Sequence, residues 1–123
     1  MGQEKRPKLR EALDHLAASL KFYDSEDRRD EVQWLAVAKA FEVAVEYAWK
    51  ELKTMVEAEG LEALSPKEAI RQAAKIGIIH DAEKWLDFVN TRNISVHDYY
   101  NLSEEDYLAL SRAFFKECRE VFD

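Results

Sequence analysis

The chain has 123 residues, of which 47% are hydrophobic and 35% are charged, and its formal net charge is −7. This length suits one domain with one core, and the composition is that of a folded globular protein rather than a disordered one. The acidic balance argues against a protein that coats nucleic acid over a broad surface, but it leaves room for a small site that handles one phosphate. We therefore expect a single domain over residues 1–123.

Several other classes of protein are disfavoured. No apolar run approaches the roughly 18 residues of a membrane span, and the first residues lead into no apolar signal-peptide core. Cys118 is the only cysteine, which excludes a disulfide framework and a cysteine-based metal site. Three Gly and two Pro are few for this length, so few turns and long helices are expected. These features predict a cytoplasmic protein without a membrane segment.

The first two predicted helices cover residues 7–23 and residues 27–59, where apolar side chains recur every three or four positions. His15 lies off the first apolar stripe and is expected at the surface. The second helix has a wide apolar sector, so it is expected to contact more than one neighbour and to offer a dimer contact, before Gly60 ends it. Its main stripe consists of Trp34, Val37, Phe41, Val45, Ala48, Leu52 and Met55, and a second stripe consists of Ala36, Ala40, Val43 and Tyr47.

Three further helices follow. A short one is predicted to begin at the capping box Ser65-Pro66-Lys67-Glu68 and to end at Gly77. Asp81 is the expected cap of a fourth helix, and Ser103 that of a fifth, which continues to the C-terminus with Cys118 buried on its apolar stripe. Four principal helices and one short helix, joined by short polar loops, predict an all-α, up-and-down four-helix bundle.

Two groups of basic residues lie near the ends of this acidic chain. Residues 112, 116 and 119 share one stripe of the predicted fifth helix. Such a stripe near a chain end usually complements the helix dipole, and an RNA-binding face is the alternative. The first group consists of Lys5, Arg6, Lys8 and Arg10, and the second consists of Arg112, Lys116 and Arg119.

Residues 91–101 hold the densest set of chemically active groups in the chain. An imidazole can exchange a proton near neutral pH, and a guanidinium can bridge two phosphate oxygens. One histidine beside Asp98 is too few ligands for a metal site, so none is expected, and no glycine-rich phosphate loop occurs anywhere. The groups suit phosphodiester chemistry; a hydrogen-bonded structural cluster is the alternative. They are Arg92, Asn93, His97, Tyr99 and Tyr100.

Helical geometry restricts how this motif can act. On one ideal helix, Arg92 and His97 are five positions apart and point roughly 140° away from each other. They would therefore not meet on one small ligand. Either the helix ends or kinks within the motif, or a second copy of the chain completes the site in a two-fold dimer.

The order of elements resembles a known family. Residues 41–50 are rich in aromatic side chains, and they are followed by the Ser-Pro-Lys-Glu start, by Gly77-Ile78-Ile79, by Trp85 and by Arg92-Asn93-x-x-x-His97-x-Tyr99. The last pattern is similar to the R-x4-6-H signature of the HEPT superfamily (higher eukaryotes and prokaryotes nucleotide-binding). The chain as a whole resembles the branch of that superfamily named nucleotidyltransferase substrate-binding proteins.

The resemblance implies a four-helix bundle that forms a homodimer and pairs with a minimal nucleotidyltransferase, without a cofactor. In one account of such pairs, the bundle is a metal-independent RNase toxin that acts through Arg92 and His97, helped by Asn93. The transferase neutralises it by transferring AMP to the motif tyrosine, Tyr99, whereas Tyr100 is an extra phenol and a less favoured acceptor. In the other account, the bundle is a non-catalytic subunit that binds nucleotide or substrate for the transferase.

Overall fold

The computed structural model describes residues 6–25, 31–92 and 103–123. Within these ranges the chain forms helices and no strand, which confirms the all-α prediction. The helices are α1 (Pro7–Ser25), α2 (Glu31–Ala58), α3 (Pro66–Lys75), α4 (Ala82–Arg92) and α5 (Glu104–Phe122). No helix of this described part is long and apolar enough to cross a membrane.

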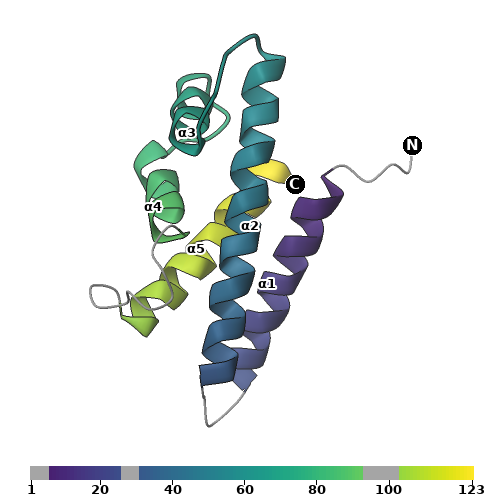
Figure 1. Cartoon of the computed structure of the whole chain (residues 1–123), viewed down its shortest axis with the longest axis vertical. Helices are drawn as coiled ribbons and strands as arrows, with labels where there is room; N and C mark the ends of the chain where they lie inside the picture. The colour runs from purple at the N-terminus through teal and green to yellow at the C-terminus, as the bar shows by residue number, and fades with distance from the viewer. Residues whose placement is uncertain (1–5, 26–30, 93–102) are drawn as a thin grey trace.

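The longest helix, α2, lies at the centre of the molecule and contacts each of the other four. Figure 1 shows α1 running antiparallel beside it, α3 and α4 along its other side, and α5 crossing behind it. The end of α5 reaches the start of α1, where Arg10 and Asp123 lie 3.5 Å apart. The prediction that this helix contacts several neighbours is therefore confirmed, while its dimer contact stays a prediction.

Local sequence determines where the described helices begin and end. Ser65, Asp81 and Ser103 each accept a hydrogen bond, at 3.0–3.1 Å, from the backbone N–H three residues later. These are the predicted caps, each worth about 1 kcal/mol of stability. Gly60 and Gly77 follow α2 and α3 with φ angles of 85° and 82°, a left-handed conformation that glycine adopts without steric cost.

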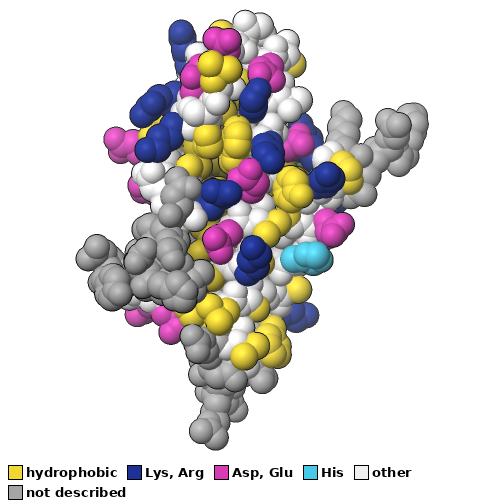
Figure 2. Space-filling view, viewed as in Figure 1, with side chains coloured by type: hydrophobic (Ala, Val, Ile, Leu, Met, Phe, Trp, Pro, Cys, Tyr) yellow, Lys and Arg dark blue, Asp and Glu magenta, His cyan; other side chains and the backbone are white. Residues whose placement is uncertain are grey.

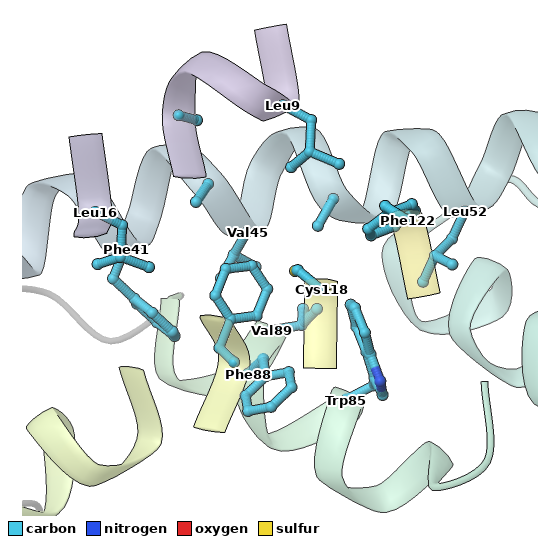
Figure 3. Close-up of a cluster of buried hydrophobic side chains, with 14 of the residues drawn as sticks. Leu9, Leu16, Phe41, Val45, Leu52, Trp85, Phe88, Val89, Cys118 and Phe122 are labelled. Carbon is cyan, nitrogen blue, oxygen red and sulfur yellow. The ribbon is translucent and has the colours of Figure 1, made fainter. Parts of the chain in front are cut away.

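The core is built on aromatic rings from three helices (Figure 3). Phe41 of α2, Phe88 of α4 and Phe114 of α5 are each 0% exposed. The ring of Phe114 lies 5.4 Å from that of Phe41 and 5.2 Å from that of Phe88, both edge to face. Trp85 packs against the rings of Phe88 and Phe114, and Cys118 is buried in the same cluster as predicted. This cluster fixes how α4 and α5 sit against α2.

The second apolar stripe predicted on α2 lies outside the fully buried core. Ala36 is exposed, and Ala40, Val43 and Tyr47 are only partly buried. At 100° per residue this stripe lies roughly 130° around the helix from the main one. The neighbouring helices instead cover both flanks of the main stripe, so the additional buried positions are Ala38, Ala44 and Val56.

Candidate functional site

Arg92 is the one residue of the predicted active set that the structure describes. It is the last residue of α4, and its Nη2 lies 2.5 Å from Oε1 of Glu46, in the middle of α2. Asn93, His97, Tyr99 and Tyr100 lie outside the described residues. The predicted helix end, kink or dimer completion within the motif lies outside them as well.

The packing of α4 explains why Arg92 faces α2. Trp85 and Phe88 are buried in the core, at 1% and 0% exposure. Arg92 follows Trp85 by seven positions, close to two full turns, so both lie on the same side of α4. The arginine thereby continues the core-facing stripe at its last turn. One third of its side chain (33%) remains exposed, which keeps the site accessible to a ligand.

Glu46 is held by groups from its own helix as well as by Arg92. Its carboxylate accepts a hydrogen bond from Nε1 of Trp49 at 3.3 Å and forms an ion pair with Nζ of Lys50 at 3.1 Å. Both donors lie one turn further along α2, so they hold the carboxylate from one side while Arg92 approaches from α4. Trp49 and Lys50 therefore fix the Glu46 carboxylate, and the fixed carboxylate orients Arg92.

The environment keeps Glu46 ionised. Burial opposes its charge, but the hydrogen bonds from Lys50 and Trp49, with the positive charges of Arg92 and Lys50, outweigh burial and hold the pKa of Glu46 below its ordinary value. At neutral pH the carboxylate is therefore charged. Arg92 keeps an anionic partner that fixes its position.

The charges around Glu46 suit a phosphodiester. Arg92 and Lys50 contribute two positive charges against one carboxylate, so these three side chains together are net positive within an acidic protein. A guanidinium carries five N–H donors in a planar fork that matches phosphate oxygens. No group of three or more His, Cys, Asp or Glu side chains in the described ranges is placed to hold a metal ion.

Sequence reasoning missed the role of Glu46. The i, i+4 spacing of Glu46 and Lys50 is compatible with the ion pair that they form on α2. Its contact with Arg92 depends on how α4 crosses α2. Neither helix carries a local signal for that crossing, so only the folded arrangement reveals the pair.

Comparisons with known proteins agree with the resemblance. Residues 5–123 match the family described as nucleotidyltransferase substrate binding protein like. A crystal structure of a protein from Thermus thermophilus is similar, with 32% sequence identity and a TM-score of 0.61, over 92% of this chain and 88% of that one. No curated protein matches the sequence. Because the family match spans nearly the whole chain, this protein belongs to the nucleotidyltransferase substrate binding protein like family.

Proposed function

We propose that this protein is the HEPT-type component of a toxin–antitoxin pair, a metal-independent RNase that a minimal nucleotidyltransferase neutralises. The observation that carries the proposal is the complete Arg92-Asn93-x-x-x-His97-x-Tyr99 pattern in a member of this family. The anchoring of Arg92 by Glu46 supports it, because a catalytic guanidinium needs a fixed orientation.

The proposed reaction is cleavage of RNA by its own 2′-hydroxyl. His97 takes the proton of the 2′-hydroxyl, and the oxygen attacks the adjacent phosphorus. The bond from phosphorus to the 5′ oxygen breaks, which leaves a 2′,3′-cyclic phosphate and a 5′-hydroxyl that takes up one proton. Arg92 stabilises the negative charge that builds up on the phosphoryl oxygens, and Asn93 orients the imidazole or the substrate.

The proposal includes a homodimer. The leaving 5′ oxygen needs a proton donor, and this chain has one histidine in the motif. A second copy related by a two-fold axis would supply another His97 as the acid. In each copy, we propose that α1, α2, α4 and α5 form an up-and-down four-helix bundle, with α3 as the additional short helix.

Modification of Tyr99 would switch the activity off. Transfer of AMP to its hydroxyl releases pyrophosphate from ATP and leaves a bulky, negatively charged nucleotide two positions after His97. That phosphate would compete with RNA for the Arg92 guanidinium. Tyr100 is the alternative acceptor but is less favoured, because the family pattern requires only the first phenol.

Growth of a host that expresses the protein tests this proposal. Wild type, Arg92→Ala and His97→Ala are produced alone and together with a minimal nucleotidyltransferase. We expect inhibition by wild type alone, and relief by either substitution or by the transferase. Equal growth of wild type and His97→Ala, at equal protein levels, would contradict the toxin proposal.

A non-catalytic nucleotide- or substrate-binding subunit is the second candidate. The net charge of −7 favours it, because an acidic surface repels RNA. Figure 2 shows acidic and basic side chains interspersed over the viewed face, not gathered into one basic surface. Incubation with the transferase and ATP separates the candidates by mass spectrometry. AMP on a peptide that contains Tyr99 supports the toxin, whereas an unchanged mass in a stable complex supports the binding subunit.

A further inference from the structure

A second candidate site lies between the start of α1 and the end of α5. The cavity there has a volume of about 240 Å³. Arg6 and Arg10, from the first basic group of the sequence, meet Arg119 from the second group along its wall. Arg92 does not line it, so the cavity is separate from the site described above.

The floor of this cavity is apolar. Leu9 and Phe122 are buried, at 2% and 8% exposure, and Leu13 and Phe115 pack beside them as partly buried side chains. The guanidinium of Arg6 lies over the ring of Phe122, 5.5 Å from its centre. A flat apolar group on this floor would therefore contact both hydrocarbon and aromatic surfaces.

The rim of the cavity carries more arginine than aspartate side chains. Three arginines line the cavity together with Asp14 and Asp123. The Asp123 carboxylate forms ion pairs with two of the arginines. Its oxygens lie 3.5 Å from Arg10 Nη2 and 3.5 Å from Arg119 Nε. Pairs of this length between exposed side chains are weak. An incoming anion could replace Asp123 between the two guanidiniums.

Arg6 also lines the cavity. Its Nε lies 3.3 Å from Oε1 of Glu51 in α2, in an ion pair that lacks hydrogen-bond geometry. Its backbone has a φ of 56°, in the left-handed region that residues other than glycine rarely adopt. Backbone conformations of this kind are enriched at binding sites.

We propose that this cavity binds a small aromatic anion. Its ring would lie on the floor of Leu13, Phe115 and Phe122, and its phosphate or carboxylate between Arg10 and Arg119. The volume is below the roughly 300 Å³ at which pockets for drug-sized ligands begin, so one ring system with one anionic group fits best. The two aspartates disfavour a long polyanion. Mononucleotides and aryl carboxylates share this chemistry.

Binding to the purified full-length chain tests the proposal by calorimetry and by NMR of its backbone amides. The probes are AMP and phenylacetate, with adenosine (a ring without charge) and inorganic phosphate (a charge without a ring) as controls. We expect AMP or phenylacetate to bind at least tenfold more tightly than both controls and to shift amide signals at the start of α1 and the end of α5. Binding of AMP would identify the ligand as a mononucleotide, and binding of phenylacetate would identify it as an aryl carboxylate.

Paired variants separate this cavity from general charge effects. The double variant Arg10→Gln/Arg119→Gln removes two exposed charges at the rim and should weaken binding at least tenfold. Lys39→Gln/Lys67→Gln removes the same charge from exposed positions on α2 and α3 and should leave binding unchanged. The proposal is overturned if no aromatic anion binds, if phosphate alone binds as tightly, or if both variants weaken binding equally. RNA cleavage is not a readout, so failure here leaves the proposed function standing.

Discussion

Oε1 of Glu46, in the middle of α2, lies 2.5 Å from Nη2 of Arg92, the residue that ends α4. This contact joins the longest helix of the protein to the first residue of the predicted active motif. Trp49 and Lys50 hold the same carboxylate, so the position of Arg92 depends on a prearranged cluster rather than on one flexible pair. Glu46 is therefore a positioning residue for Arg92 in the proposed reaction.

Replacement of Glu46 by glutamine should reduce RNA cleavage at least tenfold, because the guanidinium loses its charged anchor. The free energy of unfolding should fall by only about 1 kcal/mol, since the pair is partly exposed. Cleavage rates and urea unfolding curves check both parts. Glu57→Gln, which removes an exposed carboxylate paired with Lys53 on the same helix, is the matched control. An equal loss of cleavage in both variants, in kcat as well as in KM, would indicate a general charge effect.

The Glu46 cluster should respond to pH only under acidic conditions. Since the pKa of Glu46 lies below its ordinary value of 4.5, its stabilising contribution is present above that pH and is lost as the pH falls through the lower, folded-state pKa. The indole N–H signal of Trp49, which donates to Glu46, reports this step in an NMR titration. We expect a midpoint below 4.5 that is absent from Glu46→Gln. A midpoint at or above 4.5 would contradict the ionised cluster.

Truncation of Phe114 should be severely destabilising. Its ring is fully buried between Phe41 and Phe88, so Phe114→Ala removes contacts from three helices and leaves a cavity. The expected loss is about 3–5 kcal/mol in urea unfolding. Phe22→Ala, at a side chain that is 47% exposed, should change stability by less than about 0.5 kcal/mol. Similar losses for the two variants would show that the aromatic cluster is not the core.

Cys118 should not react with thiol reagents in the folded protein. Burial raises the pKa of its thiol well above the ordinary value, and the carboxylates of Glu117 and Asp123 add to that effect. The neutral thiol thus favours the native state below the unfolded thiol pKa of about 8.5, and this contribution is lost as the pH rises through the higher, folded-state pKa. Absorbance with a chromogenic disulfide measures the reaction. Rapid labelling without denaturant at pH 8 would contradict this packing.

Much of the fold was predictable because its signals are local. Ser65, Asp81 and Ser103 cap helices through contacts three residues away, and Gly77 ends a helix through its own φ angle. The apolar stripe that begins at Ala36 was predictable in the same way, yet Ala36 is exposed. Periodicity reports that a face is apolar, but the packing of other helices decides whether it is buried.

The two candidate sites were predictable only in part, because they also depend on how the helices pack. The motif identified Arg92, yet its contact with Glu46 joins helices that are distant in the sequence. Arg112 was predicted to complement a helix dipole or to face RNA. In the structure it forms a bidentate ion pair with Asp24 of α1, at 2.7 and 2.9 Å, which raises the pKa of its guanidinium. Such long-range pairs follow from tertiary packing, which spacing along one helix does not encode.

Arg92 and His97 are proposed to cleave RNA without a metal ion. The direct measurement incubates the purified chain with RNA in the presence of a metal chelator and analyses the ends of the products. We predict that wild type yields 2′,3′-cyclic phosphate ends, whereas Arg92→Ala and His97→Ala lose cleavage by at least a hundredfold. The account is contradicted if wild type leaves the RNA intact, or if His97→Ala cuts it as fast as wild type does.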